Sequence, residues 1–290
     1  MSTTPAVAAT ELAPFGPLWL RHAPHASAAL LNPQAREAFG ALAENAPEGA
    51  EAFALECGLA PNVRPHLYIA VQDARAKEAI GHGDVGGLLY LRYTLNNAGR
   101  ASVPLPHRPG PSGRGDWPAW LASLRDRGLP AATAAQVQDW LASLPDTARI
   151  DNAAWLDRRP GQPLRLYVSG LPDGLPPGVP HATATLPDAA AVLAALAHRH
   201  VAIVDLDEKG TRPRWGLELL AARHPAGALA RWAPMIDALA AHGFCTPEGA
   251  QGLAQWCGGD QRGISHMKLM LEDGRVRDAR AFLLARRAAA

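Results

Sequence analysis

Short segments in which apolar and polar residues alternate recur along most of the chain. In residues 66–72, for example, Leu67, Ile69 and Val71 alternate with polar or small residues. This period of two is typical of strands that bury one face. Together with short apolar runs between turn residues, it predicts nine strands, at 52–59, 66–72, 88–95, 149–156, 164–170, 201–207, 212–220 and two within 263–287.

Helical segments separate these strands in a regular order. Asn32 and Pro33 provide an N-cap and an N1 proline, Asp116 caps another helix, and Thr133 caps a third. The predicted helices are 33–44, 73–80, 117–127, 133–144, 188–198, 226–241 and 247–256. Strands in hairpins between helices indicate an α+β protein with an antiparallel sheet, built from repeated α-β-β-α units. Such a sheet either stays open or curls into a barrel with the helices outside. We expect a loose N-terminal segment at 1–25 and one domain at 26–290.

The polar faces of the predicted strands are rich in arginine, lysine, histidine and tyrosine. Three of the four tyrosines of the chain, Tyr68, Tyr90 and Tyr167, lie on these faces. A solvated sheet face is one interpretation, but such a face usually carries Thr, Lys and Glu. Large amphipathic rings are more typical of a ligand cavity, which favours a closed barrel.

The last predicted ribbon, 263–287, turns at Asp273-Gly274, a pair typical of two-residue hairpin turns. Simple pairing across this turn places residues opposite each other as follows: Glu272 and Arg275, Met270 and Arg277, Lys268 and Ala279, His266 and Ala281. The second face then carries Met267, Leu269, Leu271, Val276 and Phe282, with Asp278 and Arg280 as exceptions.

Composition excludes several classes of function. The chain has 290 residues, 48% hydrophobic and 19% charged, and its net charge of +1 argues against a nucleic-acid-binding protein. The sequence contains no apolar run of the roughly 20 residues that span a bilayer, and residues 1–12 lack the pattern of a secretion signal. Three cysteines without CxxC spacing indicate neither disulfides nor a zinc site. We therefore expect a cytoplasmic protein.

Other motifs do not fit their contexts. The segment GHGDVG, 81–86, lies between a helix and a strand, the reverse of a phosphate-binding glycine loop. The carboxylates of DLDEKG, 205–210, are interpreted as the end of a strand and a turn rather than a magnesium site. Histidines at 22, 25, 198 and 200 lack a further metal ligand at the usual spacing, and no metal site is predicted.

A cavity that combines cations with tyrosines suits an allylic diphosphate. Arginine and lysine match its oxygens, and aromatic faces stabilise a neighbouring carbocation. With this combination, the sequence resembles the ABBA-type (PT-barrel) prenyltransferases, most locally in AFALECGLAPNVRPHLYIAV, 52–71, and LRLYVSG, 164–170. Chain length and the segment IDNAAWLDRRPGQPLRLYV, 150–168, resemble the peptide-modifying, cyanobactin-like branch. The resemblance implies a closed antiparallel barrel of about ten strands with helices outside.

The resemblance also implies roles for individual residues. Glu56 matches the catalytic glutamate on an early strand, and Glu218 is the rival for this task. A structural role for Glu56, in an ion pair with Arg64 or Arg92, remains the alternative. The other expected groups are diphosphate ligands at Arg92, Arg165, Lys268, Arg214 and Arg277, a cation shield at Tyr68, Tyr90 and Tyr167, and an acceptor pocket at His66 and His266. This interpretation requires no cofactor, although Mg²⁺ is a candidate ion to bind with the diphosphate.

The expected function is transfer of an isoprenyl group from an allylic diphosphate to a nucleophilic side chain of a peptide or to an aromatic acceptor. The alternative is a non-catalytic protein that binds a peptide in a biosynthetic complex. A closed cavity favours catalysis, and an open groove favours peptide binding.

Overall fold

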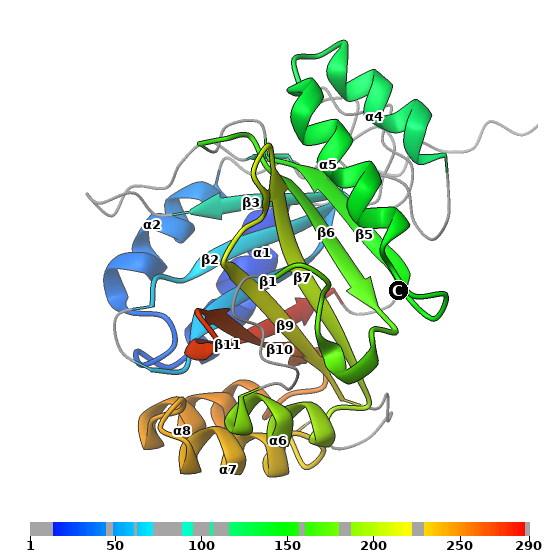
Figure 1. Cartoon of the computed structure of the whole chain (residues 1–290). Helices are drawn as coiled ribbons and strands as arrows, with labels where there is room; N and C mark the ends of the chain where they lie inside the picture. Colours follow the sequence, from blue (N-terminus) through cyan, green and yellow to red (C-terminus); the bar gives the residue numbers. More distant parts are fainter. Residues whose placement is uncertain are drawn as a thin grey trace, which may run out of the picture.

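The computed structural model describes residues 14–44, 49–60, 63–71, 89–94, 105–106, 116–156, 160–179, 187–221 and 229–287. Within them, an antiparallel sheet forms the centre of the molecule (Figure 1). Its order is β4-β3-β2-β1-β11-β10-β9-β7-β6-β5, with β8 paired to β7. The strands are β1 Ala50–Gly58, β2 His66–Val71, β3 Leu89–Thr94, β4 Leu105–Pro106, β5 Arg149–Trp155, β6 Leu164–Ser169, β7 Arg199–Asp207, β8 Gly210–Thr211, β9 Arg214–Leu220, β10 Arg262–Glu272 and β11 Arg275–Arg286.

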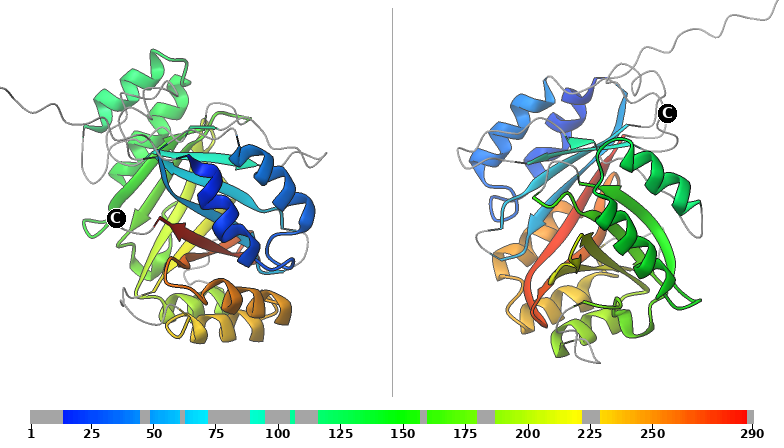
Figure 2. Two further views of the ribbon diagram at one scale, coloured as in Figure 1. Left: turned by 180° about the vertical axis from the view of Figure 1, so that it is seen from behind. Right: turned by 45° about the horizontal axis from the view of Figure 1, so that its top comes forward.

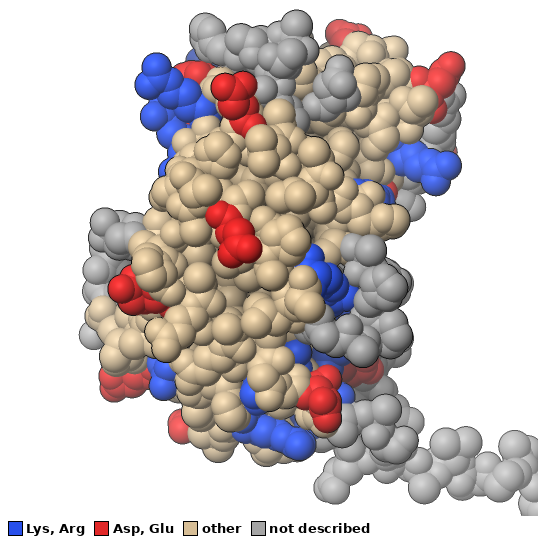
Figure 3. Space-filling view, turned by 90° about the horizontal axis from the view of Figure 1, so that it is seen from below, with Lys and Arg blue, Asp and Glu red and all other residues tan. Residues whose placement is uncertain are grey.

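The helices lie around the outside of the curled sheet (Figures 1 and 2). They are α1 Phe15–His22, α2 Pro33–Ala43, α4 Trp117–Arg125, α5 Ala131–Ala142, α6 Asp188–Leu196, α7 Ala233–Ala241 and α8 Pro247–Trp256, with 3₁₀ turns at Ala23–His25 and Pro172–Gly174. Figure 3 shows the outer face of α6, α7 and α8, where the described charged residues of both signs are scattered without a continuous basic patch. In the described ranges, no helix is both long and apolar enough to cross a bilayer.

In the part of the chain that the structure describes, the predicted order of helices and strand hairpins is confirmed, while α1, β4 and β8 were not predicted. Asn32 accepts a hydrogen bond from the backbone N–H of Ala35 and Asp116 from that of Ala119, so both predicted N-caps are present. The predicted cap at Thr133 is wrong, because α5 begins at Ala131 and Thr133 is buried inside it. The helix predicted at 73–80 lies outside the described residues.

Part of the segment that we expected to be loose forms α1 and packs onto the sheet. Phe53 of β1 is fully buried, and its ring centroid lies 5.8 Å from that of Phe15, 5.4 Å from that of Trp19 and 6.2 Å from that of Trp256. The apolar side of β1 therefore holds α1 and α8 together.

The last hairpin departs from the predicted register. Its turn has the expected positive φ at Asp273 (51°) and Gly274 (68°), and Glu272 pairs with Arg275. Beyond it, Leu271 pairs with Val276 but Met270 pairs with Asp278, so Arg277 is an extra residue, a β-bulge. Lys268 consequently lies opposite Arg280, and His266 opposite Phe282, where simple pairing predicted Ala279 and Ala281.

The bulge changes which side chains share a face. Val276 packs against the core beneath the helices, whereas Asp278, Arg280 and Phe282 lie on the other side of the sheet. The prediction that Phe282 belongs to the apolar face is therefore wrong, and Asp278 and Arg280 are no longer exceptions. Both join the face of Lys268 and His266.

The closure of the sheet into a barrel is not seen among the described residues. No described pair joins β3 or β4 to β5, the two ends of the strand order. The described strands form a strongly curled antiparallel sheet.

We predict that Phe53→Ala lowers the free energy of unfolding by about 3–5 kcal/mol, because it leaves a cavity between three aromatic rings. Urea denaturation followed by circular dichroism measures this change. The control is Leu20→Ala on α1, where the side chain is 73% exposed and a change within about 0.5 kcal/mol is expected. Equal stabilities of the Phe53 and Leu20 variants would contradict the assignment of Phe53 as the residue that holds α1 and α8.

Candidate active site

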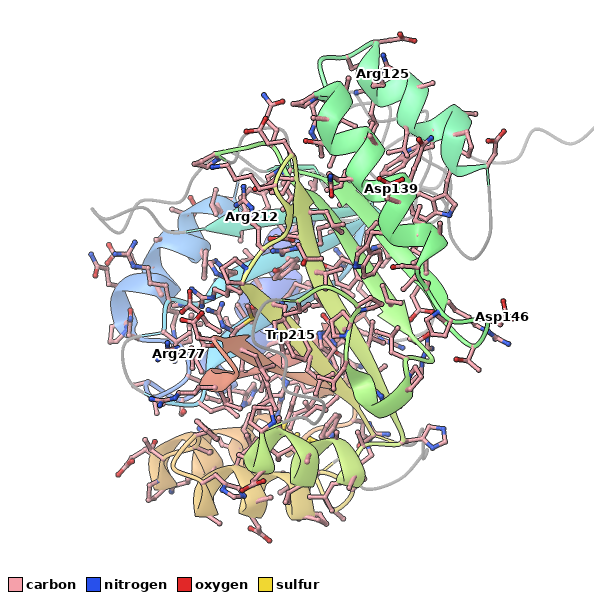
Figure 4. All side chains as sticks on the ribbon, viewed as in Figure 1. Arg125, Asp139, Asp146, Arg212, Trp215 and Arg277 are labelled. Atoms are coloured by element: carbon pink, nitrogen blue, oxygen red, sulfur yellow. The ribbon has the colours of Figure 1, made fainter. Side chains whose placement is uncertain are left out.

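The polar side chains of seven strands gather on the concave side of the curled sheet. Tyr68 of β2 and Arg165 of β6 are separated in the sheet by β1, β11, β10, β9 and β7. They nevertheless lie close enough for an electrostatic interaction between the two side chains. The curl therefore brings polar residues from distant strands into one cluster. Figure 4 shows the side chains between the strands.

Glu56 lies at one side of this cluster and is 2% exposed. Its Oε2 accepts a hydrogen bond of 2.7 Å from the Tyr68 hydroxyl, and its Oε1 accepts one of 3.0 Å from Arg280 Nη1. Glu56 forms an ion pair with Arg280, and the expected pair with Arg64 or Arg92 stays a prediction. Two such donors stabilise the ionised carboxylate.

A chain of ion pairs continues from Arg280. Its Nε donates to Asp278 Oδ1 over 3.0 Å, and Arg214 Nη2 donates to Asp278 Oδ2 over 3.2 Å. Burial disfavours the charged form of Arg280, but Asp278 and Glu56 outweigh it and raise the pKa of the guanidinium. Arg214 is half exposed, so it lies at the rim of the cluster.

Arg165 forms a second buried pair. Its Nε and Nη2 donate to the two carboxylate oxygens of Asp205 over 2.7 and 2.8 Å, a bidentate geometry. Burial opposes the charge, yet Asp205, with help from Tyr167 and Tyr68, raises the pKa of Arg165 above its ordinary value. Nη1 takes no part in this bidentate contact.

Lys268 lies at the centre of the strand order and is 6% exposed. It is opposite Glu218 on β9 and opposite Arg280 on β11. A Cβ at Gly216 would lie 2.9 Å from Lys268 Cε, so the glycine leaves the space that the lysine stem occupies.

His266 extends the cluster along β10. Its ring stacks on Phe282, with the centroids 3.9 Å apart and the planes at 25°. Its Nε2 is 3.5 Å from Glu218 Oε1, and its Nδ1 is 3.0 Å from Ser265 Oγ. The Phe282 ring also lies 5.7 Å from that of Tyr68. Aromatic faces therefore line the side of the cluster near Glu56.

Most of the predicted site residues meet in this cluster. The structure brings together Glu56, Tyr68, Arg165, Tyr167, Arg214, Glu218, His266 and Lys268. His66 lies opposite Glu56 in the register of β1 and β2. Tyr90 and Arg92 belong to β3 in the expected phase, but their side chains are outside the described part of the chain.

Arg277 is not brought to the cluster. It is the bulged residue, and its guanidinium lies 3.5 Å from Glu272 and 3.6 Å from Asp273 at the hairpin turn. The side chain is 44% exposed, and Figure 4 shows it at the margin of the strands.

Four residues of the cluster were not anticipated as site residues: Asp205, Asp278, Arg280 and Phe282. Asp205 lies in the strand predicted at 201–207, as expected, but its pairing in register with Arg165 was not anticipated. The alternation of β7, with Val201, Ile203 and Asp205 in one phase, contained the signal for Asp205. Asp278, Arg280 and Phe282 lie on the concave side only because of the β-bulge at Arg277.

The described cluster contains as many carboxylates as cations. The cations are Arg165, Arg214, Lys268 and Arg280, and the carboxylates are Glu56, Asp205, Glu218 and Asp278. Among the described residues, no three metal-ligating side chains form a metal site. The arrangement offers positively charged donors for an anion beside aromatic faces and a buried carboxylate.

No family model matches the sequence, and no curated protein matches it. Among solved structures, the prenyltransferase PriB in ternary complex with L-tryptophan and dimethylallyl thiolodiphosphate aligns over 94% of both chains, with a TM-score of 0.53 and 13% sequence identity. The apo form of PriB aligns over 94% of this chain and 96% of PriB, with a TM-score of 0.52 and 14% identity. PriB is an ABBA-type prenyltransferase, whereas the cyanobactin-like branch finds no support here. The chain therefore shares the fold of PriB, and a curled antiparallel sheet with outer helices is confirmed, whereas closure of the barrel stays a prediction.

Proposed function

We propose that the protein transfers an isoprenyl group from an allylic diphosphate to an aromatic acceptor. One observation carries this proposal: buried cations and tyrosines share the concave face of a fold that PriB also has. PriB binds L-tryptophan and a dimethylallyl thiolodiphosphate, which makes an indole the first acceptor to consider here.

The proposed diphosphate site consists of Arg165, Lys268 and Arg280, with Arg214 at its rim. Lys268 supplies a point charge from the centre of the sheet, and Arg165 offers the Nη1 edge that Asp205 does not hold. Cationic donors that are already in place lower the barrier to ionisation, since they stabilise the charge that develops on the departing diphosphate. Arg92 lies opposite Tyr68 in the register of β2 and β3 and is a further candidate.

The allylic cation would face Tyr68, Tyr167 and Phe282. These rings stabilise positive charge through their faces and exclude water from it. Tyr90 has the same phase on β3 and is proposed to complete the shield. The described carboxylates already bind arginine or histidine side chains, so we propose no step through Mg²⁺.

Glu56 is proposed to accept a hydrogen bond from the acceptor and so raise its nucleophilicity. Its two oxygens already bind Tyr68 and Arg280, but a carboxylate has about four acceptor positions. The pair with Arg280 fixes Glu56 in position. His66, opposite Glu56, would border the acceptor.

A non-catalytic peptide-binding protein is the second candidate. An open groove would support it, but the proximity of Tyr68 and Arg165 across the sheet favours an enclosed site. We propose that β3 and β4 approach β5 to close the barrel. A tryptophan residue within a peptide presents the same indole as the free amino acid, so peptide acceptors belong in the same test.

The test of the function is product formation. We expect the protein, incubated with allylic diphosphates of five, ten and fifteen carbons and with L-tryptophan, tryptophan-containing peptides or other aromatic molecules, to form a prenylated product that mass spectrometry detects. Binding of these peptides without any product from any donor would instead establish the peptide-binding function.

The donor site is tested by Lys268→Met, which removes the charge and retains most of the stem. The Kd of an unreactive isoprenoid thiolodiphosphate should rise by about 10- to 150-fold, or about 1.5–3 kcal/mol, the scale of a hydrogen bond to a charged group. Calorimetry measures this change. Arg125→Met, on the exposed end of α4, is the matched control and should bind as the parent does (Figure 4). An unchanged Kd for Lys268→Met would remove Lys268 from the site.

The role of Glu56 is tested by Glu56→Gln, which keeps the shape and removes the charge. We expect turnover to fall by about 10- to 150-fold through loss of a charged hydrogen bond, while donor affinity stays the same. The melting temperature should also decrease, because Arg280 then keeps only Asp278 as its anionic partner. Full turnover together with a lowered melting temperature would assign Glu56 a purely structural role.

A further inference from the structure

His22, the last residue of α1, is buried in surroundings that do not satisfy a polar ring. The residue is 3% exposed, and neither Nδ1 nor Nε2 has a hydrogen-bond partner among the described residues. The ring lies beside Phe53 of β1, with the centroids 6.5 Å apart. Buried polar atoms in proteins nearly always have a partner, and leaving one without a partner is costly. An apolar side chain would suit this position better, so the histidine calls for an explanation.

The charged groups that act on His22 are all basic. Burial is the largest cause that lowers the pKa of His22, and Arg262 of β10, Arg21 of α1 and His25 of the 3₁₀ turn lower it further. No carboxylate in the described part of the chain acts on it in the opposite direction. The imidazole is therefore neutral in the folded protein near neutral pH, and protonation would place a new charge among cations.

Arg262 is held in place beside this histidine. Its Nε donates to the Trp256 carbonyl over 2.9 Å, and its guanidinium carbon lies 6.0 Å from the centroid of the Trp256 ring. An arginine does not lose its proton in a protein. The repulsion that a protonated His22 meets is therefore built into the packing of α8 and β10.

The two ends of α1 are attached to the rest of the molecule in different ways. Before its first residue, the Pro14 carbonyl accepts a hydrogen bond of 2.6 Å from Arg287 Nη2, and Arg287 Nε donates to the Ala50 carbonyl of β1 over 2.7 Å. At its last residue, the attachment is the packing of His22 against Phe53. Figure 2 shows α1 against the outer side of the sheet. Only the second attachment contains a group that titrates near neutral pH.

We propose that α1 is released from the sheet in mildly acidic conditions, with His22 as the group that senses the proton. A released His22 binds a proton at its ordinary pKa of about 6.5, whereas the packed residue resists protonation. The stability that the packing of α1 contributes is therefore fully present above about pH 6.5 and is lost progressively as the pH falls below that value.

Release of α1 has a consequence for the candidate active site. The apolar side of β1, with Phe53, loses part of its cover, and the other side of the same strand carries Glu56. Acidification thus reaches the concave cluster through β1 without titrating any member of it. This device follows from the packing of α1 and does not depend on the proposed function.

Amide hydrogen exchange of the full chain, followed by mass spectrometry between about pH 7.5 and about pH 5, tests the proposal. After correction for the intrinsic dependence of exchange on pH, we expect the protection of residues 15–22 to fall by up to about tenfold for each pH unit below about 6.5. Helix α5 contains no histidine and is the internal control, which should keep its protection. Equal losses in α1 and α5 would show general acid unfolding and overturn the proposal.

Two variants identify the sensing group. His22→Phe removes the titration and keeps an aromatic ring beside Phe53, and His22→Leu does the same with a smaller side chain, so the test does not depend on one substitution being accommodated. In both, the protection of α1 should no longer change with pH in this range. His242→Leu, at the exposed C-terminal end of α7, is the matched control and should retain the parental pH dependence.

Two results would overturn the assignment of His22. One is a parent protein whose α1 protection does not change with pH, and the other is a parental loss of protection that persists in both His22 variants. Because exchange is measured without substrate, the outcome is separate from that of the prenyl-transfer assay.

Discussion

The extra residue at Arg277 is the constraint on which the candidate site depends. A strand with strict alternation would place Val276, Asp278, Arg280 and Phe282 on one face, which suits neither the core nor a polar cavity. The bulge lets Val276 face the helices while the next three members of the series face the concave side. A second extra residue, Ser265, restores the register further along the ribbon. Between these two bulges, β11 presents the carboxylate of Asp278, the guanidinium of Arg280 and the ring of Phe282 to the concave side of the sheet.

The three arginines of the cluster, Arg165, Arg214 and Arg280, are held by carboxylates before any ligand arrives. Removing ion pairs from water is costly, so such pairs contribute little net stability, but they keep each guanidinium in a fixed orientation. Asp205 holds Arg165 through two parallel contacts, and Asp278 bridges Arg280 and Arg214. A diphosphate that enters this cluster meets oriented donors and competes with the carboxylates for them. If the cluster binds the donor as proposed, it should select a highly charged anion, because a weaker anion would not offset that competition.

Alternation was sufficient to predict which face of β2, β6 and β9 carries Tyr68, Arg165 and Glu218, because each of these strands is regular. It was not sufficient for β11, since a bulge is decided by the pairing of two strands and not by residue type. Asp205 was placed on the correct strand, but its role was missed because its partner, Arg165, is known only once the pairing of β6 and β7 is known. The helix α1 was missed because Gly16 and Pro17 weaken its pattern, although Phe15, Leu18, Trp19 and His22 have helical spacing.

The contact between Glu56 and Arg280 joins residues 224 positions apart in the chain. They belong to neighbouring strands, so the middle of the sheet consists of an early strand, β1, beside a very late one, β11. During synthesis, chains emerge from the ribosome at about 5–20 residues per second, so the edge of β1 that β11 will cover stays unpaired while most of the chain is made. An uncovered apolar edge of this kind invites pairing with other chains. The geometry that completes the cluster thus leaves this strand edge open to wrong pairing until β11 has been made.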